Sequence, residues 1–148
     1  MKKIVFALLT IILAACSFTA SSEYDQNLGK WQDAKITHYR YTLSIGCFCA
    51  FREDMPVTVE VLNGEIVSII SANGSPMDSA NPAYSSVEYY ATMDRLFTQL
   101  KSALDEADEV AAVYDSTYGF PTSISIDQIK DAVDDELFIT VENFEVLE

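Results

Sequence analysis

The chain has 148 residues, of which 49% are apolar and 22% are charged, with five Gly and four Pro. These proportions exclude a disordered, collagen-like or low-complexity protein, and the length predicts one domain. Nine Lys and Arg face 23 Asp and Glu, a net charge of -14. This balance argues against nucleic acid as a partner, because affinity for phosphate backbones depends mainly on basic side chains.

The N-terminus predicts export and a lipid anchor. Lys2 and Lys3 precede an apolar run at residues 4–14. Such a run is typical of a signal peptide and is shorter than the roughly 20 residues that cross a bilayer. The run leads into the sequence LAAC, which ends at Cys16 and resembles the lipobox of bacterial lipoproteins, where the Cys is lipidated and becomes the new N-terminus. An ordinary secreted protein cleaved after Ala15 is the alternative.

This interpretation sets the expected domain bounds and location. We expect residues 1–15 to be the signal peptide, residues 16–23 the lipidated Cys16 with its tether, and residues 24–148 a single domain. The mature chain would lose two lysines and no acid, for a net charge of -16. The membrane is then a partner through the lipid on Cys16. By resemblance to Gram-negative lipoproteins, the Ser after that Cys implies the outer membrane, facing the periplasm.

The first two elements of the domain are a helix and a strand. Residues 24–35 carry apolar side chains at spacings of three and four, which predicts a short amphipathic helix with Trp31 as its anchor on the core. Residues 36–46 alternate between apolar and polar, so the odd-numbered side chains should lie on the buried face of a strand. That buried face would continue through Cys47 and Cys49 to Phe51 if the chain stays extended, and a break at Gly46 is the alternative.

The segment VTVEVLNGEIVSII predicts a β-hairpin. Asn63-Gly64 fits a type I′ turn, since both central positions of that turn need a positive φ. Counting outward from the turn pairs Val61 with Ile66, Val59 with Ser68, and Val57 with Ile70. The core face should then carry Val57, Val59, Val61, Ile66 and Ile70, with Glu60 and Glu65 on the opposite face.

One longer helix is expected next. After a loop at residues 71–84, Ser85 and Glu88 fit a capping box. Apolar residues then recur at spacings of three and four as far as Ala107, which predicts one amphipathic helix of about five turns. Its predicted core positions are Tyr90, Met93, Phe97, Leu100, Leu104 and Ala107.

A second hairpin and a last strand complete the chain. The hairpin is predicted from Val110–Asp115 and Phe120–Asp127, and an acidic link at residues 128–135 leads to a strand at residues 136–147. A change of parity after Asn143 indicates a bulge in that strand. Together the elements predict an α+β fold: an antiparallel sheet of five to six strands built from hairpins, with one long and one short helix packed on one face.

Several segments resemble a known family. They include Tyr39-x-Tyr41 followed by Cys47-x-Cys49, and the segment YDSTYGFP that begins at Tyr114. These resemble segments of a family of uncharacterised bacterial lipoproteins, a domain of unknown function, over nearly all of the chain after Lys30. Ser116 stands where the family is expected to carry Pro. The resemblance implies a small lipid-anchored domain and implies no activity.

Cys47 and Cys49 are the main candidate for chemistry. With Cys16 lipidated, they are the only intrachain pair left, in a compartment that favours disulfides. Residues i and i+2 of an ideal strand have Cα atoms roughly 6.5–7 Å apart, whereas disulfides usually need about 4.4–6.8 Å, so a bridge requires a bent backbone. Three interpretations stay open: a structural staple, which we favour, a thiol–disulfide redox site, and unpaired or intermolecular thiols.

An aromatic cluster and two acidic runs are further candidates for binding sites. Tyr114, Tyr118 and Phe120 are candidates for an exposed contact patch, because aromatic side chains are enriched at binding hot spots. The favoured alternative places Tyr114 and Phe120 in the core and leaves only Tyr118 exposed. The acidic runs at residues 105–109 and 131–136 lack EF-hand spacing, which favours a solvated surface over a Ca²⁺ site.

No catalytic arrangement stands out in the sequence. The single His, His38, falls on the face of its strand opposite the two Cys, which argues against zinc, and no Gly-x-Ser-x-Gly motif occurs. We expect no metal and no cofactor. The expected function is a non-catalytic binding or accessory module with an envelope protein as candidate partner, and the alternative is a thiol–disulfide redox lipoprotein. The oligomeric state stays open.

Overall fold

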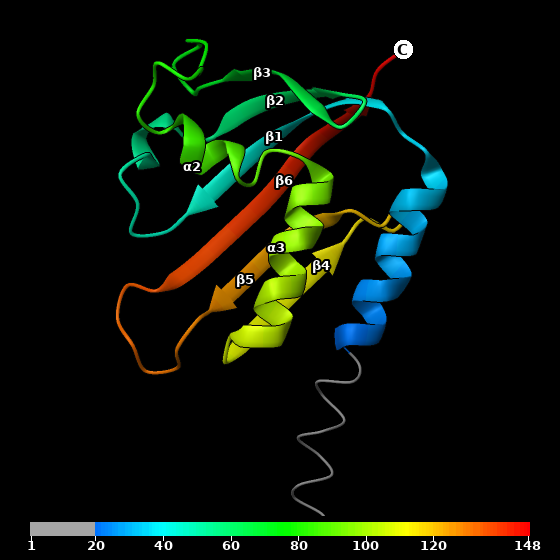
Figure 1. Cartoon of the computed structure of the whole chain (residues 1–148), viewed down its shortest axis with the longest axis vertical. Coiled ribbons are helices and arrows are strands. Elements are labelled where there is room, and N and C mark those ends of the chain that lie inside the picture. The colour runs from blue at the N-terminus through cyan, green and yellow to red at the C-terminus, as the bar shows by residue number, and fades with distance from the viewer. Residues whose placement is uncertain (1–19) are drawn as a thin grey trace, which may run out of the picture.

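The computed structural model describes residues 20–148, which form one six-stranded antiparallel sheet with helices packed against it (Figure 1). This confirms the predicted α+β fold. The predicted signal peptide, Cys16 and residues 17–19 lie outside the described residues. In chain order the elements are a helix at residues 20–34, β1 (His38–Gly46), the 3₁₀ turn η1 (Arg52–Asp54), β2 (Val57–Leu62), β3 (Glu65–Ile70), α2 (Tyr84–Glu88), α3 (Met93–Glu106), β4 (Glu109–Tyr114), β5 (Pro121–Asp127) and β6 (Glu136–Val146).

The strands lie in the order β3-β2-β1-β6-β5-β4, so the first and last strands of the chain pair at the centre. Each half of the chain adds one hairpin, β2–β3 on one side and β4–β5 on the other, and the edges are β3 and β4. The helix at residues 20–34 and α3 cover the same face of the sheet (Figure 1), with α3 in contact with β4 and β5. None of the described helices is long and apolar enough to cross a membrane.

The alternation predicted for β1 is confirmed. Tyr39, Tyr41, Leu43 and Ile45 are all buried against the helices. The strand ends at Gly46, where the chain bends out of the sheet. The break at Gly46, one of the two predicted alternatives, is therefore the one that occurs, and Phe51 returns to the core from the turn beyond.

The β2–β3 hairpin has the predicted turn, but only part of the predicted register. Asn63 and Gly64 have φ values of 52° and 80°, as a type I′ turn requires, and Val61 pairs with Ile66. Beyond that pair the register shifts, because Val67 is an extra residue on β3. A one-residue slip moves side chains to the other face, so Ile69 is buried in the core and Ile70 is only half-buried. The other two predicted pairs, Val59 with Ser68 and Val57 with Ile70, are wrong for this reason.

The bulge predicted in β6 is confirmed. Thr42 on β1 pairs with Glu142, whereas Arg40 pairs with Glu145, so β6 carries one extra residue between these pairs. Asn143 adopts a φ of 52° there. The extra residue lets the Phe144 ring pack against the core, where it lies 4.4 Å from the Phe120 ring between centroids.

The helices differ from their predicted bounds. Residues 20–23, assigned to a tether, are helical, and the predicted long helix is divided into α2 and α3 by residues 89–92. The capping box at Ser85 is wrong. The N-cap of α3 is Thr92, whose Oγ1 accepts a hydrogen bond from the Arg95 N–H at 3.2 Å. The buried residues of α3 are Met93, Leu96, Phe97, Leu100 and Ala103.

Two buried tyrosines on β1 should respond oppositely to loss of the hydroxyl. The Tyr39 hydroxyl accepts a hydrogen bond from the Met93 N–H at 3.1 Å, whereas the buried Tyr41 hydroxyl has no partner among the described residues. We expect Tyr39→Phe to lower the free energy of unfolding by about 1 kcal/mol and Tyr41→Phe to raise it by about 1 kcal/mol. Urea unfolding of both variants checks this, and a destabilised Tyr41→Phe would contradict it.

The pKa values of the same two tyrosines predict that the fold loses stability at alkaline pH. Burial raises the pKa of Tyr39 from 10.0 to about 12, and raises the pKa of Tyr41 well above 10.0. The folded state favours the neutral phenol, so this stabilisation is complete below pH 10 and is lost as the pH rises towards 12. We expect Tyr39 alone to account for a fall of roughly 2–3 kcal/mol in the free energy of unfolding. Urea unfolding between pH 9 and 12 checks this, with Tyr39→Phe expected to show a shallower fall.

Candidate functional site

The Cys47–Cys49 loop begins where β1 ends. The two Cys form a disulfide with Cα atoms 5.2 Å apart, within the usual range, because the chain bends after Gly46. The interpretation as unpaired thiols is thereby excluded for this structure. Both Cys are half-buried, and Phe48 between them is 80% exposed. Because the disulfide closes so short a loop, the side chain of the residue between the two Cys turns away from the sheet.

A pocket of about 500 Å³ lies beside this loop. Three segments far apart in the sequence meet there: the loop itself, α2 with the residues that follow it, and the link into β6. The residues that line the pocket are Cys47, Phe48, Cys49, Phe51, Ser85, Ser86, Tyr89, Tyr90, Asp134, Asp135, Glu136 and Leu137.

Aromatic side chains form one part of the pocket wall. Phe48 is 80% exposed and Tyr89 is 54% exposed, whereas Phe51 is buried and Tyr90 is half-buried. Tyr89 and Tyr90 contact each other edge to face, with ring centroids 5.1 Å apart. Tyr89 was not predicted as a site residue, because helical spacing through residues 85–107 indicates one helix. The break after α2 places its exposed side chain at the pocket.

Carboxylates form another part of the wall. Asp135 Oδ2 accepts a hydrogen bond from the Ile129 N–H at 2.8 Å, while its Oδ1 is buried without a partner among the described residues. Partial desolvation and the charges of Asp135 and Glu136 raise the pKa of Asp127 on the neighbouring strand. Negative charge is therefore concentrated at this end of β5 and β6.

The segment YDSTYGFP, which carried much of the resemblance, forms a tight loop between β4 and β5. Asp115 Oδ1 accepts hydrogen bonds from the N–H groups of Thr117 and Tyr118, at 3.0 and 2.6 Å. Gly119 has a φ of 80°, and a Cβ there would lie 2.4 Å from the carbonyl oxygen of Asn27. The loop thus holds the sheet in close contact with the helix at residues 20–34, which gives the segment a structural role.

The proposed aromatic contact patch in that loop is not assembled on the surface. Phe120 is buried, and its ring lies 4.4 Å from that of Phe144 and 6.2 Å from that of Trp31, between centroids. Tyr114 and Tyr118 are half-buried and pack against the core. Desolvation by burial, followed by the charge of Glu23, raises the pKa of Tyr114 to about 12. The arrangement supports the core interpretation for Phe120.

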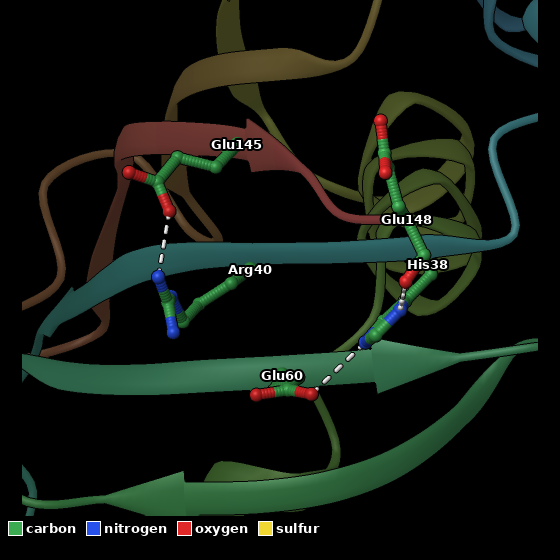
Figure 2. A network of polar contacts seen from close by, with 5 residues as sticks. All are labelled: His38, Arg40, Glu60, Glu145 and Glu148. Atoms are coloured by element: carbon green, nitrogen blue, oxygen red, sulfur yellow. Dashed lines mark hydrogen bonds and ion pairs between the residues drawn. The ribbon is translucent and has the colours of Figure 1, made fainter.

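Figure 2 shows a polar network on the face of the sheet away from the helices. His38 Nε2 lies 2.9 Å from Glu60 Oε1, and His38 Nδ1 lies 3.3 Å from the Glu148 carbonyl oxygen. Arg40 Nη2 donates to Glu145 Oε2 at 2.8 Å. The network links β1 to β2 and β6, and it contains no hydroxyl or thiol that His38 could activate as a nucleophile. We interpret it as cross-strand pairing of surface charges, which contributes little to stability.

The acidic runs do not assemble into a metal site in residues 20–148, where no group of three or more His, Cys, Asp or Glu has suitable geometry. In the first run, Asp105 pairs with Lys101 at 2.7 Å, and Asp108 Oδ2 accepts a hydrogen bond from the Lys130 N–H at 2.9 Å. The pocket beside the Cys47–Cys49 loop is therefore the candidate functional site.

Comparison with known proteins identifies a family but no activity. The model of a family of unknown function (DUF6174) matches residues 23–146. No curated protein matches the chain, and no solved structure matches it either.

Proposed function

The chain belongs to this family of unknown function, and we propose that it is a non-catalytic binding or accessory module of the cell envelope. In this proposal, lipid on Cys16 anchors the protein. One observation carries the proposal. The pocket of about 500 Å³ beside the Cys47–Cys49 loop presents two aromatic side chains, Phe48 and Tyr89, at 80% and 54% exposure.

Two large aromatic side chains exposed at one pocket support the proposal of contact with a partner. Leaving a Phe or Tyr ring in water forgoes the free energy that its burial would provide, about 1.5–3 kcal/mol for a side chain of that size. Binding sites in proteins are concave, are lined by aromatic and apolar groups, and contain a few polar groups that set specificity. The pocket has this composition, and binding would bury both rings.

Site-specific crosslinking in cells tests the proposal. A photoreactive amino acid at Phe48 or Tyr89 of the full chain should give adducts with one partner. The same group at Val67, a β3 residue outside the pocket that is 54% exposed like Tyr89, is the matched control. Adducts at Val67 equal to those at Phe48, or none at any position, would contradict a contact site at the pocket.

The lipid anchor has its own test. We expect the wild-type chain to incorporate labelled fatty acid and to fractionate with membranes. Cys16→Ser should lose both properties and leave the protein in the soluble fraction. Retention of that variant in the membrane fraction would contradict anchoring through Cys16.

A thiol–disulfide redox function is the second candidate, because the Cys47–Cys49 bridge forms part of a pocket wall where a substrate thiolate could reach it. The reduction potential of this pair separates the two functions. A value below about -300 mV marks a structural disulfide, whereas a value of about -120 to -270 mV lies among known exchangers. A potential in the second range would make redox chemistry the leading function.

A further inference from the structure

The pocket beside the Cys47–Cys49 loop combines two kinds of wall. Of its twelve lining residues, four are aromatic, three are acidic and none is Lys, Arg or His. The acidic residues, Asp134, Asp135 and Glu136, follow one another in the link into β6. A ligand in this pocket would therefore meet aromatic rings and negative charge together.

Among the described residues, no cation forms an ion pair with the carboxylates of this wall. The ion pairs among residues 20–148 use Glu60, Glu145, Glu88 and Asp105, and none uses residues 134–136. Asp135 Oδ1 is buried and accepts no hydrogen bond from residues 20–148. The raised pKa of Asp127, caused by partial desolvation and then by Asp135 and Glu136, agrees with an excess of negative charge here.

These features disfavour three classes of ligand. An anion would be repelled by three carboxylates, and a purely apolar ligand would cover them without pairing them, which costs free energy. A divalent metal ion would need several ligands in suitable geometry, and the described residues hold no such group. A cationic head on an aliphatic stem satisfies both walls, because the stem can pack on the aromatic rings while the head donates charge-assisted hydrogen bonds to the carboxylates.

We propose that this pocket binds a Lys or Arg side chain of a partner protein, with its aliphatic stem against Phe48 and Tyr89 and its charged group directed to Asp134–Glu136. The exposed surfaces of the Phe48 and Tyr89 rings are larger than a small free cation would cover. This favours a side chain that is part of a protein, because the protein can cover the rest of the rings. This inference rests on the proposed binding function and adds the chemistry of the partner.

Calorimetric titration of the full chain in detergent micelles tests the inference. The probe is the peptide acetyl-Val-Lys-Val-Lys-Val-amide, and its counterpart with Glu in place of Lys is the charge control. We expect the Lys peptide to bind, the Glu peptide not to bind, and added salt to weaken the binding. Glu136→Gln should reduce the affinity about tenfold, the ratio that corresponds to loss of one charge-assisted hydrogen bond.

Glu65→Gln is the matched control variant. Glu65 and Glu136 are both exposed and both begin a strand, but only Glu136 lines the pocket, so Glu65→Gln should bind the Lys peptide as the wild type does. Phe48→Ala should weaken binding severalfold through loss of the aromatic wall. Equal affinities of the wild type and Glu136→Gln would overturn the assignment to this pocket.

Two further outcomes separate this inference from the proposed function. If the Lys peptide does not bind although Phe48 forms crosslinks in cells, the cationic ligand is wrong and the binding function stands; if both experiments fail, both proposals are wrong. Spermidine is the probe for a small free cation. Binding of spermidine as tight as that of the Lys peptide would overturn the assignment to a protein side chain.

Discussion

Gly119→Ala is expected to lower the free energy of unfolding by about 3–4 kcal/mol. Two costs combine at this position. Its φ of 80° is unfavourable for any residue with a Cβ, and the added Cβ would lie 2.4 Å from the Asn27 carbonyl oxygen and 2.8 Å from the Lys30 Cβ. Both contacts belong to the helix at residues 20–34, whose backbone can yield only if the helix moves away from the sheet.

Gly74→Ala is the control for the backbone strain alone, without the close contact with the helix. Gly74 has a φ of 82°, but a Cβ there meets nothing within 4 Å. We expect Gly74→Ala to cost about 1–2 kcal/mol through backbone strain only. Urea unfolding of both variants measures the difference, which isolates the close contact with the helix. Equal losses of stability in the two variants would show that the loop does not hold the helix tightly.

Trp31→Ala is expected to lower the free energy of unfolding by about 3–5 kcal/mol. Trp31 is 6% exposed, and its ring lies 5.4 Å from that of Tyr39 and 6.2 Å from that of Phe120, between centroids. Its Nε1 donates a hydrogen bond to Asp94 Oδ1 in the first turn of α3 at 3.2 Å. The side chain therefore joins the helix at residues 20–34 to β1, to the YDSTYGFP loop and to α3.

Two other substitutions separate these contributions in the same unfolding experiment. Trp31→Phe retains an aromatic ring in the core but loses the hydrogen bond to Asp94, so it should cost clearly less than Trp31→Ala. Phe48→Ala removes an aromatic side chain that is 80% exposed, and we expect a change within about 0.5 kcal/mol. A loss for Trp31→Ala no larger than that for Phe48→Ala would contradict the role of Trp31 as an anchor.

The β-strands were predictable because period-two alternation and turn chemistry are local signals. The buried faces of β1 and β2 and the turn at Asn63-Gly64 follow from a few adjacent residues. The register of β3 was not predictable from the same signals. Ile69 and Ile70 are both apolar, and only the bulge at Val67, which depends on packing against the rest of the sheet, decides that Ile69 faces the core.

The division of the predicted long helix has a tertiary cause. Helical spacing runs through residues 85–107, so periodicity alone indicates one helix. α3 instead begins at Met93, after the N-cap Thr92, and the Met93 N–H donates to the Tyr39 hydroxyl 54 residues earlier in the chain. Such a partner is invisible to a pattern of neighbouring residues, and the break it accompanies is what brings Tyr89 to the pocket.

The candidate site was predictable only in part. The sequence pointed to Cys47 and Cys49 as a pair that could bridge if the backbone bends, and they form a disulfide. The sequence also shows an acidic run at residues 131–136, which was predicted to be a solvated surface. That this run lies in the same pocket as Phe48 and Tyr89 depends on the pairing of β1 with β6, which join distant parts of the chain.

The amino-acid sequence by itself determined the strands, the buried faces of β1 and β2 and the α+β class, because these depend on spacing and turn chemistry between near neighbours. Tertiary structure decided the strand order, the position of Ile69 and the joining of aromatic and acidic walls in one pocket. The physical reason is the range of the interactions. Alternation and turn chemistry depend on residues a few positions apart, whereas side-chain packing and cross-strand pairing depend on residues far apart in the chain.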